Sequence, residues 1–367
     1  MRRSVIQILI ALSFLCVGAY GYAQPGDAPA MEEIPSLVVS VRVKPPLDFC
    51  GEPAPLNTFD ARERLEKELL IMLWDRDQTI LWIKRSNRYM PYIQSMLKAN
   101  NLPDDLKYIP IIESSLRALA GSPKGAVGYW QFIKDTGERY GLGVTEDIDA
   151  RRNIMTSTQA AITYLKKLHD DFGSWTLAAA AYNMGEQGLK REIQLQDTSD
   201  FYNLYLYQET QRYVFRILAA KLILSNPEKY GFIMAPEDLY PPQEFDRVSL
   251  NLPQRTPVLS IARAAQTTFK AIRDLNPEIR GHYLPKGYLT ISIPQGASTG
   301  FQERLNQQLQ LLQAQVTSDR VYVVRNGDSL SEIAARLSIP MSSLRQWNHL
   351  RQDQPIHPGD RLILHSN

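Results

Sequence analysis

An internal repeat near the C-terminus constrains this sequence more than any other feature. Residues 261–291 align without gaps on residues 333–363, which places Ile261 on Ile333 and Leu275-Asn276 on Trp347-Asn348. Each copy has two short helical patterns that end in asparagine, then a turn with Pro and Gly, then an alternating strand. The second copy also has a leading strand over residues 321–324. We therefore predict two small βααβ units, over 245–297 and 320–365, joined by a Gln-rich helical spacer over 298–319.

The longer region before the repeat has helical periodicity. From Asp60 onward, apolar residues such as Leu65, Leu69 and Met72 recur at helical spacing between charged residues. Further helical patterns cover residues 130–140, 157–172, 175–183, 199–208 and 210–225, and a Pro-rich stretch over 235–257 ends the series. We predict an all-α domain over 60–232, after an extended lead-in over 24–59. The expected fold class is therefore mainly α, followed by two α+β units.

The N-terminus has the composition of a secretory signal peptide. Arg2 and Arg3 precede an apolar run over residues 5–19, and Gly21-Tyr22-Ala23 offers a small-x-small cleavage site. The run is shorter than the roughly 20 residues of a membrane span. We expect a signal peptide over 1–23 and an exported protein of the bacterial periplasm, with an uncleaved membrane anchor as the alternative. Lipidation of Cys16 is disfavoured because Leu15, just before it, is not small.

Composition excludes several function classes. The 41 Lys and Arg nearly balance the 39 Asp and Glu, unlike the strongly basic surface of a general nucleic-acid binder. Two cysteines cannot build a disulfide framework or a cysteine zinc site, and no HExxH or phosphate-binding glycine loop occurs. We therefore expect no nucleic-acid partner, no metal and no organic cofactor.

A single carboxylate stands out in the helical region. Glu113 lies among Ile109, Ile111 and Ile112. Desolvation in such a segment favours the neutral acid and raises its pKa, which suits a proton donor working near neutrality. A glutamate at a helix end that points to solvent is the alternative that this segment alone leaves open.

Three further segments could complete a site. Residues 122–132 form a glycine-bearing loop in which Tyr129 and Trp130 could offer flat faces to sugar rings, although a core position is the alternative for Trp130. Small residues over 178–181 would allow close helix packing before the polar pair Tyr182-Asn183. A last helix carries Tyr213.

Together these segments resemble the soluble-lytic-transglycosylase domain, which has the lysozyme-like fold shared with goose-type lysozymes. The matching motifs, over about residues 85–230, are Glu113-Ser114, Ser122-x-x-Gly125-Ala126, Gly128-x-Trp130-Gln131, Ala181-Tyr182-Asn183 and the Tyr213 helix. The C-terminal copy of the repeat resembles a LysM domain through Gly327-Asp328-Ser329-Leu330, Asn348 and Pro358-Gly359-Asp360. The earlier copy resembles a degenerate LysM, with Thr256-Pro-Val-Leu259 in place of the Gly-Asp-Ser loop.

The first resemblance implies cleavage of the β-1,4 bond between N-acetylmuramic acid and N-acetylglucosamine in peptidoglycan glycan strands. One glutamate, Glu113 here, would act first as acid and then as base and give a 1,6-anhydro product. Ser122 and Gln131 would bind sugar near the cleaved bond. Tyr182, Asn183 and Tyr213 would line the cleft, with Tyr213 bonded to Glu113, and ordinary burial is the alternative for both tyrosines.

No second carboxylate lies inside these motifs, in contrast to the usual pair of a glycosidase. Asp135, Glu138 and Glu186 are interpreted as solvated helix faces. Two departures from the family pattern, Tyr129 and Met184, bear on glycan preference. A hydrolytic muramidase on the same fold and an inactive wall-binding scaffold remain the rival interpretations.

The LysM resemblance implies a groove for N-acetylglucosamine between two loops. One loop contains Gly327, Asp328, Ser329 and Leu330, and the other contains Ile356. Asp328 or Ser329 would equally serve as a helix N-cap, and both roles can hold together. We expect the earlier copy to pack structurally or to bind glycan weakly.

Overall fold

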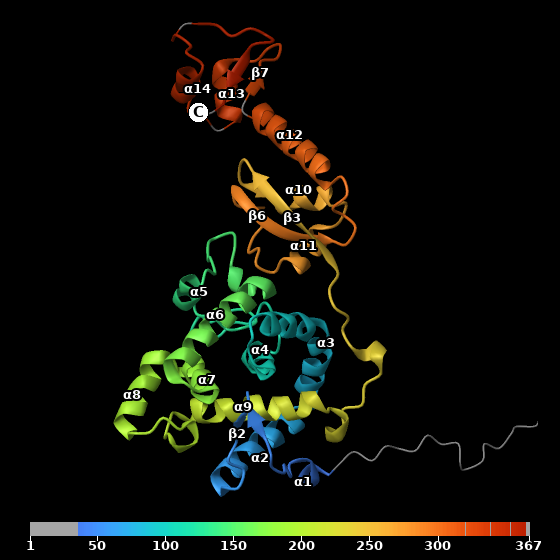
Figure 1. Ribbon diagram of the computed structural model, residues 1–367. Helices are drawn as coiled ribbons and strands as arrows, with labels where there is room; N and C mark the ends of the chain where they lie inside the picture. The colour runs from blue at the N-terminus through green and yellow to red at the C-terminus, as the bar shows by residue number, and fades with distance from the viewer. Residues whose placement is uncertain (1–35, 320, 338, 353, 365–367) are drawn as a thin grey trace, which may run out of the picture.

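The computed structural model describes residues 36–364 apart from 320, 338 and 353 (Figure 1). The expected signal peptide, Cys16 and the first part of the lead-in lie outside the described residues. A helical domain comes first, a small unit with two paired strands follows, and a second small unit lies beyond a connecting helix (Figure 1). The mainly α fold class expected from the sequence is confirmed.

The helical domain contains most of the helices of the described chain. Their bounds are α2 Phe59–Trp74, α3 Arg76–Ala99, α4 Ile109–Ser114, α5 Lys134–Arg139, α6 Ile154–Phe172, α7 Trp175–Met184, α8 Glu186–Gln196 and α9 Gln208–Ser225. Local chemistry sets several ends: the Asn153 side chain accepts from the first amides of α6, and Gly173 ends α6 with a positive φ of 69°.

Helix α9 is the central element of this domain. It packs against α2, α4 and α7 (Figure 1), and most of its apolar side chains, from Val214 to Ile223, are buried. Its polar side chains bind the neighbouring elements: Arg212 pairs with buried Glu68 of α2, and Lys221 reaches Asp105 and Asp48. Because each of these carboxylates has its cation on α9, one helix fixes the positions of the others.

Two local predictions in the helical domain are wrong, and one helix was not predicted. The helix expected over 199–208 is one 3₁₀ turn, Phe201–Asn203, because Asp200 caps it and the chain then extends to bury Leu204 and Leu206. The helix expected from residue 130 begins at Lys134, since Gln131 adopts a φ of +50° in a tight turn. No helix was predicted over residues 186–196, where α8 lies.

The lead-in is folded over its described part rather than extended. It forms a short helix, α1 Leu37–Ser40, and a hairpin of β1 Asp48–Phe49 and β2 Glu52–Pro53. Phe49 and Leu56 are buried in the core of the helical domain. The apolar pieces between the prolines are therefore core residues, which a local composition count cannot reveal.

Both small units have the βααβ order. In the first, β3 Phe245–Leu252 pairs antiparallel with β6 Gly287–Pro294, around β4 Thr256–Pro257, α10 Val258–Ala264, α11 Phe269–Leu275 and β5 Tyr283–Leu284. In the second, β7 Val321–Val323 pairs with β8 Arg361–Ile363 around α13 Leu330–Arg336 and α14 Met341–Trp347. The connecting helix α12, Phe301–Asp319, begins as part of the first unit, because Phe301 and Leu305 complete its core.

The repeated asparagine has the same role in both units. The Asn276 amide donates to Ile272 and Ser292 carbonyls and accepts from the Ser292 amide. Asn348 makes the equivalent bonds to Leu344 and Ile363. Each asparagine thus joins the end of the second helix to the last strand. Within the described residues, no helix is both long and apolar enough to cross a membrane.

The lead-in contributes directly to helix α7, which gives a stability prediction. The Glu52 carboxylate accepts from the Trp175 and Thr176 amides at 2.5 and 3.0 Å and from two nearby hydroxyls. It satisfies free amides at a helix N-terminus, where negative charge is favourable. Glu52→Ala is expected to lower the free energy of unfolding by about 2 kcal/mol, measured by urea denaturation. Glu63→Ala, at an exposed site of α2, should change it by less than about 0.5 kcal/mol, and equal effects would contradict this assignment.

Candidate active site

Glu113 lies at the end of the short helix α4. Ser115 and Leu116, directly after the helix, both have positive φ angles of 57° and 55°, so the chain turns sharply behind the glutamate. The flanking side chains Ile111 and Ile112 are buried, while Glu113 itself is partly accessible. A carboxyl group in this position is largely shielded from water but remains partly accessible at the protein surface.

Burial raises the pKa of Glu113 from its usual value to about 7. Two groups act in the opposite direction: Tyr213 donates a hydrogen bond to Glu113 Oε1 at 2.5 Å, and the Arg216 guanidinium lies nearby. Glu209, on the first turn of α9, raises the pKa further by its charge. At neutral pH both the acid and the carboxylate are therefore populated, and the interpretation of Glu113 as a solvated helix-end residue is wrong.

Tyr213 is held rigidly on α9. Its side chain is almost fully buried, and its pKa is well above the usual value, first because of burial and then because of the Glu113 charge. A neutral phenol that cannot ionise is a permanent donor to the carboxylate. Arg216, one turn later, donates to the Ile112 carbonyl at 3.1 Å and so fixes α4 to the same helix.

Residues 120–132, here called the catalytic loop, lie beside Glu113 and are bonded to two helices. The Ser114 hydroxyl donates to the Tyr129 carbonyl at 2.7 Å, and the Tyr182 hydroxyl donates to the Trp130 carbonyl at 2.6 Å. Ser114, next to Glu113, and Tyr182, near the end of α7, therefore both hold the catalytic loop in place.

Two of the expected sugar-binding residues, Ser122 and Gln131, stabilise this loop. The Gln131 amide nitrogen donates to the Gly128 and Ala120 carbonyls at 2.8 and 3.2 Å. The Ser122 hydroxyl accepts from the Ala126 amide at 3.1 Å. Both side chains remain partly accessible, but the Gln131 nitrogen is already used within the loop.

Asn183 is oriented by a residue that the sequence did not suggest. The Thr210 hydroxyl donates to Asn183 Oδ1 at 2.9 Å, so the oxygen of this amide is bonded and its nitrogen is the group that can still donate. Thr210 is buried on α9, one turn before Tyr213. That spacing within the helix carrying Tyr213 is the signal that could have identified it.

The proposed stacking faces of the catalytic loop are wrong. Trp130 is 0% exposed and Tyr129 is 3% exposed, so neither ring can meet a sugar. Trp130 packs inward and donates to the Thr158 hydroxyl at 3.0 Å, while the Tyr129 ring packs edge-on against Tyr89. The core alternative for Trp130 is correct because the loop closes over the rings that anchor it.

The three carboxylates outside the motifs differ in environment. Asp135 and Glu138 are exposed on α5, as expected for a solvated face. For Glu186 that interpretation is wrong: its side chain is only 13% exposed and forms an ion pair with Lys167. Among the described residues, no group of three or more His, Cys, Asp and Glu could hold a metal ion.

The residues expected to bind glycan in the C-terminal unit lie in two loops near α13. Asp328 accepts from the Tyr322 hydroxyl and the Arg325 amide at 2.5 and 2.8 Å, so its side chain organises the loop. Ser329 forms a capping box with Glu332. Gly327 has a positive φ, while Leu330 and Ile356 pack on the small core, and of these two Ile356 is the more accessible.

Comparison with known proteins identifies the two recognisable parts of the chain. Residues 90–205 match the Transglycosylase SLT domain, and residues 322–364 match the LysM domain. Two proteins named membrane-bound lytic murein transglycosylase D, from Escherichia coli K12 and Escherichia coli O6:H1 strain CFT073, are each 33% identical over 316 residues. These residues are 83% of this chain and 68% of each relative.

Two more distant similarities are shorter. A putative tributyltin chloride resistance protein from Alteromonas sp. strain M-1 is 36% identical over 117 residues, which are 31% of this chain and 56% of that protein. Among solved structures, an inactive mutant of lytic transglycosylase Slt from Pseudomonas aeruginosa is 22% identical, with a TM-score of 0.30. That match covers 41% of this chain and 26% of the other.

The matched SLT region contains Glu113, the catalytic loop and Asn183, whereas Thr210 and Tyr213 lie beyond its end. The two Escherichia coli relatives extend the similarity over most of the chain. The chain therefore belongs to the lytic murein transglycosylase family that includes membrane-bound lytic murein transglycosylase D, and it is a lytic transglycosylase.

Proposed function

We propose that this enzyme cleaves the β-1,4 bond between N-acetylmuramic acid and N-acetylglucosamine in peptidoglycan and forms a 1,6-anhydro product, with Glu113 as the only acid–base group. The observation that carries the proposal is the partly accessible Glu113, whose pKa is about 7 and whose carboxyl group is bonded to Tyr213. A group with that pKa can give up a proton and take one back within a single turnover.

The reaction has two proton transfers. Protonated Glu113 first donates its proton to the glycosidic oxygen, so that the bond to C1 of the muramoyl residue breaks and positive charge develops on that ring. The Glu113 carboxylate then removes the proton of the muramoyl 6-hydroxyl, whose oxygen closes onto C1. The Tyr213 hydrogen bond stabilises the carboxylate between these steps. No second carboxylate is needed, because the substrate supplies its own nucleophile.

Other side chains would hold the glycan. Asn183, whose oxygen is bonded to Thr210, can offer its amide nitrogen to an acceptor oxygen of an acetamido group or a sugar hydroxyl. We assign Ser122, Gln131 and Tyr182 to the same cleft, chiefly through the shape of the catalytic loop that they stabilise.

Mass spectrometry of muropeptides released from purified sacculi tests the reaction. The wild-type protein should release products one water lighter than hydrolytic muropeptides, and Glu113→Gln should lower the rate by at least about a thousandfold, because the amide cannot transfer the proton. Glu138→Gln, which changes an exposed carboxylate, should keep wild-type activity. Products with a free reducing end would indicate a muramidase, and sacculus binding without products would indicate a scaffold.

The pH profile tests the role of Tyr213. Since the first step requires protonated Glu113, the rate should fall as the pH rises above about 7. Tyr213→Phe removes a bond that favours the carboxylate, so the pKa of Glu113 should rise and the alkaline limb should move up by about one pH unit. Tyr205→Phe, at an 83% exposed tyrosine, should leave the profile unchanged. A shift of the limb to lower pH would contradict this assignment.

We further propose that the C-terminal LysM domain binds N-acetylglucosamine between the loop of residues 327–330 and the loop containing Ile356. The capping box of Ser329 and the bonds of Asp328 hold the first loop in a fixed shape, and Ile356 offers an apolar surface opposite it. Binding of the polymer by this domain would raise the local concentration of substrate at the catalytic cleft.

Retention on sacculi tests the LysM proposal. Ile356→Ala should weaken binding of the full chain to sacculi about three- to tenfold, because it removes apolar surface from the groove, while turnover of short soluble glycans stays unchanged. Ile363→Ala, on strand β8 and outside both loops, is the matched control. Equal binding by both variants would remove Ile356 from the proposed groove.

We propose the following domain assignment and location. Three separate apolar cores support a catalytic domain over 60–232, a LysM-like unit over 245–297 and a LysM domain over 320–365. The first core also takes in lead-in residues such as Phe49, and the second takes in Phe301 and Leu305 from the spacer over 298–319. Peptidoglycan as substrate and the membrane-bound relatives support an exported protein of the cell envelope, and the N-terminal segment 1–23 supports export to the periplasm.

A further inference from the structure

In the unit of residues 245–297, here called the middle unit, the two segments that correspond to the proposed sugar-binding loops of the C-terminal unit pair with each other. The repeat places Thr256 on Asp328 and Leu284 on Ile356, the two sides of the proposed sugar groove. In the middle unit these same positions are paired as neighbouring strands, Thr256 with Leu284 and Pro257 with Tyr283. Thr256 and Leu284 are completely buried. A sugar therefore has no place at this position of the middle unit.

The middle unit instead docks on a loop of the catalytic domain. Residues 143–153, here called the docking loop, pair with the segment that follows α11 through an antiparallel bridge between Ile148 and Ile279. The Asp149 amide donates to the Glu278 carbonyl at 2.8 Å, and the Arg280 amide donates to the Asp147 carbonyl at 2.7 Å. Ile148 packs against the core of the middle unit.

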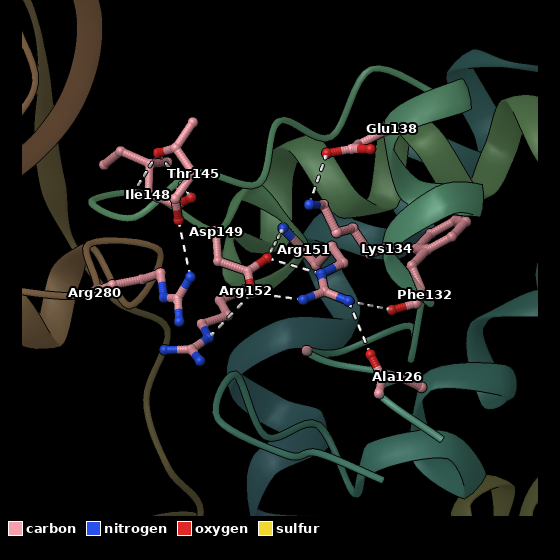
Figure 2. Close-up of polar contacts among 12 residues, drawn as sticks. Ala126, Phe132, Lys134, Glu138, Thr145, Ile148, Asp149, Arg151, Arg152 and Arg280 are labelled. Carbon is pink, nitrogen blue, oxygen red and sulfur yellow. Dashed lines mark hydrogen bonds and ion pairs between the residues drawn. The ribbon is translucent and has the colours of Figure 1, made fainter. Parts of the chain in front are cut away.

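Side chains extend this contact on both sides. The Arg280 guanidinium donates to the Thr145 carbonyl at 2.9 Å (Figure 2), and Arg255 forms an ion pair with Asp147 at 2.6 Å. Asn153, the cap of α6, donates to buried Glu278 at 2.8 Å. The contact combines main-chain pairing, apolar packing and charge, which fixes one orientation of the docking loop.

The docking loop in turn holds the catalytic loop. Asp149 and Arg151, both buried, form a bidentate ion pair with two distances of 2.8 Å, as Figure 2 shows. The remaining guanidinium nitrogen of Arg151 donates to the Gly125 and Phe132 carbonyls at 3.0 and 3.1 Å. Arg151 therefore joins both ends of the glycine-bearing turn to the Asp149 carboxylate. The main-chain amide of Asp149 is in turn bonded to the middle unit.

Gly128 shows how closely the two loops approach. A Cβ atom at this position would lie 2.0 Å from the Arg151 carbonyl oxygen, and φ is +86°. Only glycine allows this contact. The next residue, Tyr129, accepts through its carbonyl from Ser114, the neighbour of Glu113. A continuous set of contacts thus runs from the middle unit to the catalytic acid.

We propose that the middle unit is a brace, a structural support for the active site, and that it does not bind glycan. It positions the catalytic loop beside Glu113 through Asp149 and Arg151. This inference rests on the proposed function. The catalytic loop has no strand ladder: its strand pairing is limited to isolated bridges at Gly121–Val127 and Val127–Phe132, beside the turn bonds and side-chain bonds described above. Such a loop needs support from outside to hold one geometry. In this assignment Asp149 and Arg151 are positioning residues, because neither contacts substrate.

The test uses two variants of the full chain that loosen the docking. Ile148→Asp places a charge in the apolar contact, and Arg255→Ala/Arg280→Ala removes two exposed guanidinium groups while leaving the main-chain pairing. Each should lower kcat on sacculi at least fivefold, with KM and sacculus binding within twofold of wild type. Hydrogen exchange of amides 125–132 should accelerate at least tenfold. Ile148→Leu should restore wild-type kcat, and Arg263→Ala, an exposed arginine of α10 outside the contact, is the matched control.

The outcomes separate this inference from the proposed function. Wild-type kcat in the double arginine variant, which changes only exposed groups, would contradict the proposed brace. Faster hydrogen exchange of the catalytic loop without loss of kcat would contradict it too. A loss of sacculus binding with unchanged kcat would indicate instead that the middle unit binds glycan. If Ile148→Asp lowers thermal stability strongly, the double arginine variant decides alone. Absence of anhydro products from the wild-type protein would instead refute the proposed function.

Discussion

The hydrogen bond from Tyr213 to Glu113 is the interaction on which the active-site structure depends. It joins the short helix α4 to the central helix α9, and it provides a hydrogen-bond donor for a carboxyl group that burial has desolvated. The same helix fixes Asn183 through Thr210 and α2 through Arg212. Because one rigid helix positions the acid, the amide and the surrounding elements, these groups keep a common geometry.

The two copies of the repeat show how one βααβ fold can keep its frame and differ in its loops. Both retain the asparagine that joins the second helix to the last strand, because this bond satisfies main-chain groups that the fold buries. They differ where the first copy pairs its two loops as β4 and β5. That pairing buries Thr256 and Leu284 completely, whereas their counterparts Asp328 and Ile356 stay partly accessible.

The sequence indicated Glu113 as the candidate acid, and the family resemblance implied its bond to Tyr213, but neither revealed the charges that act on its carboxyl group. Glu113 stands out because apolar residues surround it locally, and the family motifs agree with it. The environment that tunes it comes from distant parts of the chain: Tyr213, Arg216 and Glu209 lie on α9. Sequence reasoning also left open that Tyr129 and Trp130 face the ligand and interpreted Glu186 as solvated, since side-chain direction in a loop and long-range ion pairs have no local signature.

The sequence alone determined the helical domain, the repeat, the placement of the acid in an apolar segment and the order of the motifs, because periodicity and motif spacing are local properties. Tertiary structure alone decided that the lead-in packs into the catalytic core, that Gln131 supports a loop, and that the middle unit bonds to the docking loop. These features depend on contacts between residues that are far apart in the chain, and only the packed core brings such residues together.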